Sequence, residues 1–123
     1  MSIIEKAGEN FKSGMNCAQS VVAQFAEKYG ADADFLIKVS SGFGGGVKSG
    51  EICGAILGGV MAIGLKYGDD KIECGKMTKA FVNRFREQNG AVTCRDLLKN
   101  TANRLTCTEK VKSAVQILCD MDI

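Results

Sequence analysis

Six cysteines are the residues of this chain best suited to chemistry, and there is no His to act as a general base. A thiolate attacks disulfides and binds soft metals. Three cysteines occur in similar tetrads, in which a capping residue precedes the Cys and a carboxylate or amide ends the group. These are Asn16-Cys17-Ala18-Gln19, Thr93-Cys94-Arg95-Asp96 and Thr106-Cys107-Thr108-Glu109. Each resembles a helix capping box, so we expect Cys17, Cys94 and Cys107 at the first position of three helices.

A fourth cysteine, Cys53, is expected within the first turn or so of another helix, which begins near residues 49–51. The start of a helix carries roughly half a positive charge and stabilises an anion by about 0.3–1 kcal/mol. Cysteines at such positions have lowered thiol pKa values. Cys74 and Cys119 differ, because each continues the apolar stripe of a helix. For these two we favour core packing.

Repulsion between thiolates limits what the four helix-start cysteines could do together. Two thiolates 4 Å apart repel by about 4 kcal/mol at an effective dielectric constant near 20, and each helix end offsets about 1–2 kcal/mol of this. Protons, a disulfide, a metal ion or an iron–sulfur cluster must therefore neutralise them. The spacings of 36, 41 and 13 residues match no zinc ribbon and no common ferredoxin motif. A metal site therefore depends on the fold bringing the four thiols together.

A glycine-rich loop over residues 42–50 could also take part in such a site. Its sequence nearly spells a phosphate-binding loop, but Val47 occupies the second required Gly position and an expected helix, not a strand, precedes it. We therefore predict no nucleotide at this loop. The N–H groups of Gly44, Gly45 and Gly46 could instead face an anion such as a thiolate or a cluster. A permissive connection between two helices is the alternative.

Apolar residues recur at helical spacing along the whole chain, and no stretch shows the sustained alternation of a strand. Helices are expected over 3–11, 16–28, 35–39, 51–65, 70–88, 94–99 and 107–119. The segment 51–65 is the most apolar, and Gly50, Gly54 and Gly58 give one face on which another backbone or a cofactor can approach closely. We predict an all-α fold. Residues 1–123 should form one compact bundle of about five to seven helices around this glycine-rich central helix.

Composition and charge exclude several classes of function. Sixteen basic and fourteen acidic residues leave a net charge of +2, which is too balanced to indicate nucleic acid or an anionic membrane as a partner. The longest apolar run is shorter than the ~20 residues of a spanning helix, and no secretory signal is visible. We therefore expect a cytoplasmic protein. Without His, haem attachment through C-x-x-C-H is excluded.

The chain resembles the bacterial and archaeal family of redox-active proteins named for the motif C_GCAxxG_C_C. The residues that carry the resemblance are Gly14-Met15-Asn16-Cys17-Ala18-Gln19, Gly42-Phe43-Gly44-Gly45-Gly46, Cys53-Gly54-Ala55-Ile56-Leu57-Gly58, Cys94 and Cys107. The chain reads Cys-Gly-Ala where the family name writes Gly-Cys-Ala. The resemblance spans about residues 11–119 and implies a small helical domain with a redox role. It also implies that the four named cysteines are Cys17, Cys53, Cys94 and Cys107.

The leading hypothesis is a small cytosolic redox or electron-transfer protein. Its redox-active thiols and metal ligands would be Cys17, Cys53, Cys94 and Cys107, and its cofactor an iron–sulfur cluster or another thiolate-bound metal. The cofactor would also contact Gly44, Gly45 and Gly46. An electron carrier is favoured over an enzyme that turns over a substrate. The alternatives are a metal-free thiol–disulfide oxidoreductase and a non-catalytic helical interaction domain with structural cysteines. A redox partner protein is expected, and a homo-oligomer is compatible with the sequence.

Overall fold

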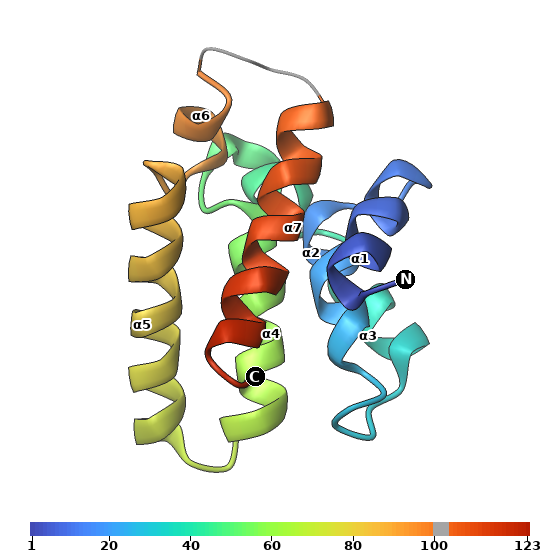
Figure 1. Ribbon diagram of the computed structural model, residues 1–123, viewed down its shortest axis with the longest axis vertical. Coiled ribbons are helices and arrows are strands. Elements are labelled where there is room, and N and C mark those ends of the chain that lie inside the picture. Colours follow the sequence, from blue (N-terminus) through green and yellow to red (C-terminus); the bar gives the residue numbers. More distant parts are fainter. Residues whose placement is uncertain (100–103) are drawn as a thin grey trace.

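The computed structural model describes residues 1–99 and 104–123, and the side chains of residues 104 and 105 are not described. The described part is all-α, which confirms the predicted fold class. Figure 1 shows the elements in space. In chain order they are α1 (Ile3–Lys12), α2 (Cys17–Val22), the 3₁₀ turn η1 (Ala23–Phe25), α3 (Ala33–Val39), the irregular turn η2 (Gly46–Gly50), α4 (Gly54–Tyr67), α5 (Lys71–Asn89), α6 (Cys94–Leu97) and α7 (Arg104–Asp120).

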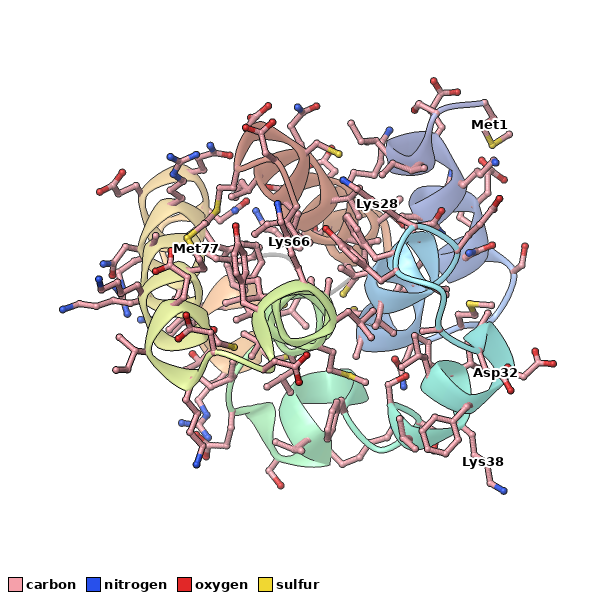
Figure 2. All side chains as sticks on the ribbon, turned by 90° about the horizontal axis from the view of Figure 1, so that it is seen from below. Met1, Lys28, Asp32, Lys38, Lys66 and Met77 are labelled. Atoms are coloured by element: carbon pink, nitrogen blue, oxygen red, sulfur yellow. The ribbon has the colours of Figure 1, made fainter. Side chains whose placement is uncertain are left out.

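Helix α4 is the centre of the bundle, as predicted for the glycine-rich segment. It packs against α2, α5 and α7, and Figure 2 looks down α4 with the other helices around it. Its side chains Ile56 and Ile63 are fully buried, as are Val115 and Leu118 of α7. Burial of this apolar surface is the main source of stability in such a bundle.

Two glycines of α4 allow α2 to approach unusually closely. A Cβ added at Gly58 would lie 2.5 Å from the carbonyl oxygen of Ala18, and one at Gly54 would lie 3.0 Å from the Cβ of Cys17. The predicted close approach of another backbone is therefore confirmed for these two positions. Gly50 lies outside the helix, in η2, where its φ is +70°. The contact between α2 and α4 thus places Cys17 directly beside the start of α4.

Three helix boundaries differ from the predicted ones by three residues or more. Helix α4 begins at Gly54 instead of near residue 51, because Ile52 forms an isolated antiparallel bridge with Thr93. Helix α2 gives way to η1 and ends short of residue 28, and residues 26–30 form a turn that closes on Gly30 with a φ of +64°. Helix α7 begins at Arg104, three residues before Cys107. Within the described ranges, no helix has the length and apolar content needed to cross a membrane.

Candidate functional site

Cys17 is the first residue of α2, and the predicted capping box is present there. The side chain of Asn16 accepts a hydrogen bond from the Gln19 N–H (2.8 Å), and the Gln19 side chain accepts one from the Asn16 N–H (2.9 Å). The Asn16 amide also donates to the carbonyls of Ser40 and Ser41, at 3.2 and 3.0 Å. The start of α2 is therefore fixed to the chain just before the glycine-rich loop.

Cys53 and Cys94 are brought together by the bridge between Ile52 and Thr93. Each cysteine follows one member of the bridge pair, so the two lie on the same face of the paired segments. The N–H of Cys94 donates to the carbonyl of Glu51 at 2.6 Å. This pairing is too short to leave an alternating pattern in the sequence, and for that reason sequence analysis missed it.

A second set of contacts holds Cys94 in place. The side chain of Thr93 accepts a hydrogen bond from the Asp96 N–H (3.1 Å), so Cys94 is the first residue of α6, as predicted. Arg95 then ties α6 to the glycine-rich loop, because its guanidinium lies 3.2 Å from the Glu51 carboxylate and 3.4 Å from the Ser49 carbonyl. These contacts connect α6 to the glycine-rich loop.

Cys107 is not at a helix start, and that prediction is wrong. Helix α7 begins at Arg104, so Cys107 is its fourth residue and Thr106 is inside the helix instead of capping it. Arg and Leu, the residue types at positions 104 and 105, are strong helix formers, which explains why the helix continues upstream of the Thr106 tetrad. Cys107 still lies within the first turn or so of α7.

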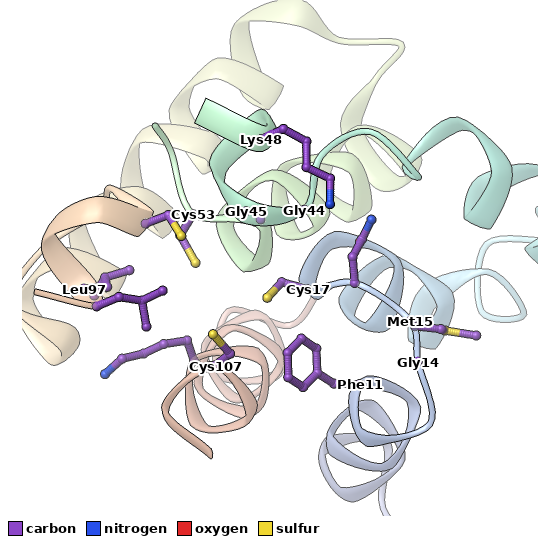
Figure 3. Close-up of a pocket in the computed structure, with 15 residues that line it drawn as sticks. Phe11, Gly14, Met15, Cys17, Gly44, Gly45, Lys48, Cys53, Leu97 and Cys107 are labelled. Atoms are coloured by element: carbon purple, nitrogen blue, oxygen red, sulfur yellow. The ribbon is translucent and has the colours of Figure 1, made fainter. Parts of the chain in front are cut away.

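One cavity of about 340 Å³ is lined by Cys17, Cys53, Cys94 and Cys107. Figure 3 shows the sulfur atoms of the labelled Cys17, Cys53 and Cys107 pointing into the same space. The remaining lining residues are small, apolar, amide or basic: Phe11, Gly14, Met15, Asn16, Gly44, Gly45, Lys48, Gly54, Leu97, Leu98 and Lys110. Among the described residues that line the cavity there is no carboxylate. The fold therefore collects four thiols from four separate segments.

The four thiols interact with one another electrostatically. A hydrogen bond that the Cys17 thiol donates to the Cys107 sulfur, together with burial and the charges of the neighbouring cysteines, raises the pKa of Cys17 far above its usual value. Burial raises the pKa of Cys53 to about 11, although the N–H groups at the start of α4 act in the opposite direction. Burial and Cys107 also raise the pKa of Cys94. The predicted lowering by helix ends is thus outweighed, for Cys17 by the hydrogen bond with Cys107 and by desolvation, and for Cys53 and Cys94 by desolvation, which disfavours the charged thiolate.

The glycine-rich loop contributes only part of the predicted cofactor-binding set. Gly44 and Gly45 line the cavity, whereas Gly46 is not among its lining residues. A Cβ at Gly46 would lie 2.6 Å from both the backbone N and O of Glu51, so this residue packs against the chain leading to Cys53. A Cβ at Gly44 would lie 2.7 Å from the Cβ of Asn16. The loop therefore needs glycine at both positions to pack between the starts of α2 and α4.

Two basic residues of the cavity, Lys48 and Lys110, were not among the predicted site residues. Lys48 and Val47 have left-handed backbone conformations, with φ values of +59° and +55°. This conformation costs L-residues roughly 1–2 kcal/mol each. A left-handed turn could have been inferred from Gly45 and Gly46, which precede Val47, together with Gly50 after Lys48. Lys110 donates a hydrogen bond to the Asn89 side chain at 3.1 Å.

Cys74 and Cys119 lie away from this cavity. Both are half-buried and pack against the main hydrophobic core, in line with the packing interpretation. All six cysteines lie in the described part of the chain, and none forms a disulfide. Within that same part, no group of three or more His, Cys, Asp or Glu side chains has an arrangement that could hold a metal ion.

Comparison with known proteins identifies the family. A family model described as "Putative redox-active protein (C_GCAxxG_C_C)" matches residues 15–121. The chain belongs to this family. The matched range contains all four cavity cysteines, and membership is consistent with a redox role. No curated protein and no solved structure matches the chain.

Proposed function

We propose that this protein is a small electron-transfer protein whose cavity thiols bind an iron–sulfur cluster. The observation that carries the proposal is the presence of Cys17, Cys53, Cys94 and Cys107 around one cavity of about 340 Å³. Four thiolates are the ligand set of both [2Fe–2S] and [4Fe–4S] clusters. The cavity volume also falls within the roughly 300–1,000 Å³ of small-ligand sites.

The donor set fits a multi-iron cluster better than a single ion. Four sulfurs around one zinc, at Zn–S distances of ~2.3 Å, would lie about 3.8 Å apart. The described cysteines are not arranged in that way, and the cavity is larger than one ion requires. A cluster distributes its ligands over several metal atoms, so its thiols need not all converge on one point.

The other residues of the cavity also suit a negatively charged cluster. Phe11, Leu97 and Leu98 supply apolar walls that restrict water, and Lys48 and Lys110 supply positive charge. Burial, hydrogen bonding and local charge are the means by which a protein sets a cluster's reduction potential. When bound, the cluster would supply one-electron transfer. An electron carrier needs a donor and an acceptor, so the proposal includes a redox partner protein.

Anaerobic purification and reconstitution with iron and sulfide test this proposal. We expect a coloured protein with stoichiometric iron and sulfide, and loss of both when any one cavity cysteine is replaced by Ser. Cys74→Ser and Cys119→Ser are the matched controls and should retain the cluster, because neither thiol lines the cavity. A protein that stays colourless and iron-free after reconstitution would disprove the proposal.

A metal-free thiol–disulfide oxidoreductase is the second candidate, and the hydrogen bond between the Cys17 and Cys107 thiols favours it. One of these thiolates would attack a sulfur of an external disulfide, forming a mixed disulfide and releasing one thiol. The other would then attack the protein sulfur of the mixed disulfide, forming the Cys17–Cys107 bond and releasing the second thiol. Two electrons pass to the external disulfide, and the two cysteine protons end on the released thiols.

Counting thiols in the metal-free protein before and after mild oxidation distinguishes the two candidates. Reversible loss of two thiols without iron uptake supports the oxidoreductase. Iron uptake that protects all four cavity thiols from oxidation supports the electron-transfer protein. If all six thiols stay reactive both after mild oxidation and after incubation with iron and sulfide, both candidates are excluded. The remaining hypothesis is then the helical interaction domain with structural cysteines.

A further inference from the structure

Lys48 is carried by a stretch of backbone that L-residues avoid. Gly45, Gly46, Val47 and Lys48 are consecutive and all left-handed, with φ between +55° and +65°. Val47 is β-branched, and a β-branched residue with positive φ is a genuine outlier. Such conformations persist only where the surrounding structure determines them, and they concentrate at functional sites.

The surrounding structure does fix this turn on both sides. The Val47 N–H donates to the Phe43 carbonyl (3.3 Å), and the Glu51 N–H donates to the Gly46 carbonyl (3.1 Å). The Arg95 guanidinium bonds the far end of the turn. Figure 3 shows the Lys48 side chain extending from this turn toward Gly44, at the edge of the thiol cavity. The fixed turn therefore places Lys48 in the lining of the thiol cavity.

The cavity has positive charge that the protein itself does not balance. Apart from the cysteines, its ionisable lining residues are Lys48 and Lys110, and within the described ranges no Asp or Glu lines it. Lys110 is held by the Asn89 side chain. In the described part of the chain, Lys48 has no hydrogen bond or ion pair. With protonated thiols the cavity thus has an excess of positive charge, which attracts an anion.

We infer that the thiol cavity selects a negatively charged occupant, and that Lys48 is its specificity-determining residue. The inference deepens the proposed function and rests on it in one respect, namely that the occupant reacts with or is bound by the cavity thiols. Two sources of such an anion share this chemistry. One is an iron–sulfur cluster with thiolate ligands, which is anionic as a whole, and the other is a small anionic disulfide.

Two alkylating reagents of nearly equal size measure the charge preference directly. Iodoacetate is anionic and iodoacetamide is neutral, and both alkylate a thiolate with release of iodide. The reduced, metal-free protein is treated with each reagent, and the rate at each cavity cysteine is followed by peptide mass spectrometry. Cys119, which lies outside the cavity, is the internal reference. Because no iron is present, the result does not depend on whether a cluster forms.

We expect Lys48→Gln to lower the iodoacetate-to-iodoacetamide rate ratio of the cavity thiols by about three- to tenfold at low ionic strength. Lys48→Arg should keep the ratio, and ~1 M salt should abolish the difference between variants. Lys71→Gln is the control, because Lys71 is far from the cavity. It is the first residue of α5, whereas Asn89, which contacts the cavity residue Lys110, is the last, about 27 Å away along the helix. An unchanged ratio in Lys48→Gln, or an equal change in Lys71→Gln, would overturn the inference.

Two further measurements on Lys48→Gln distinguish an iron–sulfur cluster from a small anionic disulfide as the occupant of the cavity. If the occupant is a cluster, reconstituted Lys48→Gln should have a more negative midpoint potential than the wild type. If it is a small disulfide, exchange with the anionic 5,5′-dithiobis(2-nitrobenzoate) should slow in Lys48→Gln, whereas exchange with neutral 4,4′-dithiodipyridine should not. A Lys48→Gln variant that matches the wild type in both measurements would also count against the inference.

Discussion

Ile52 pairs with Thr93 across an antiparallel bridge, and this backbone pairing between distant segments brings Cys53 and Cys94 to the same face. The other two thiols meet by a different route, since α2 is pressed against α4 and α7 packs on both α1 and α2. The cavity is therefore built from two pairs of cysteines. One pair depends on backbone pairing between loops and the other on helix packing.

The first prediction concerns the order in which the thiols oxidise. Mild oxidation of the reduced, metal-free protein should produce the Cys17–Cys107 disulfide before any other, because these two thiols already share a hydrogen bond. Non-reducing peptide mapping by mass spectrometry identifies the pair. Cys17→Ser should abolish that disulfide, while Cys119→Ser should leave it intact. A first-formed disulfide that includes Cys74 would contradict the geometry of the cavity.

The second prediction compares two glycines of α4. Gly58→Ala should lower the free energy of unfolding by about 1–3 kcal/mol, because the new methyl group would overlap the Ala18 carbonyl and push α2 away. Gly64→Ala is the matched control on the same helix, and nothing lies within 4 Å of its added Cβ. It should raise stability by about 0.5–1 kcal/mol through helix propensity. Chemical denaturation of both variants measures the difference, and equal effects would show that the α2–α4 contact does not require Gly58.

The third prediction tests the strain in the glycine-rich loop with two valines of nearly equal exposure. Val47 is 44% exposed and left-handed, and Val39 is 45% exposed and lies in α3. Val47→Gly should leave the free energy of unfolding unchanged or raise it by up to ~1 kcal/mol, because glycine adopts the left-handed conformation without penalty. Val39→Gly should lower it by about 0.5–1 kcal/mol. Urea denaturation measures both, and a loss of stability in Val47→Gly as large as in Val39→Gly would contradict the strained turn.

The fourth prediction concerns pH. In the reduced, metal-free protein, the pKa of Cys53 is about 11, raised from an ordinary value of 9.0. The folded state therefore holds this proton more tightly than the unfolded state, and the stabilisation is complete below pH 9 and is lost as pH rises toward 11. We expect the free energy of unfolding to fall by about 1–2 kcal/mol between pH 8 and pH 10.5 from this thiol alone. The decrease in the free energy of unfolding with pH should be less steep in Cys53→Ala and unchanged in Cys74→Ala. A Cys53→Ala slope equal to that of the wild type would show that another group controls the alkaline loss.

Local patterns were sufficient to predict much of the fold. The apolar stripes of α1, α3 and α5 involve neighbours three or four residues apart, so their information lies within each segment. The same holds for Asn16 and Gln19 at the start of α2, where the predicted pair of hydrogen bonds is present. The glycine spacing of α4 predicted a close approach, although not which helix would make it.

The remaining features depend on contacts between distant segments. The bridge of Ile52 with Thr93 shortens α4 at its start, and no local pattern marks either residue as a pairing partner. The Thr106 tetrad resembled a helix start. A residue type that often caps a helix can, however, lie inside the helix when the preceding residues favour helical structure. The thiol pKa values depend on burial, which is a property of the assembled cavity. Helix-end charge alone therefore predicted the wrong direction.

The distribution of the cavity thiols along the chain has a consequence for biosynthesis. Cys17 lies near the beginning of the sequence and Cys107 near its end, and α7 must pack before the last thiol is in place. A chain emerging from the ribosome folds from its N-terminus, so the cavity is incomplete until α7 has left the exit tunnel. A prosthetic group held by all four cysteines can therefore gain its last ligand only once α7 has been synthesised and has packed.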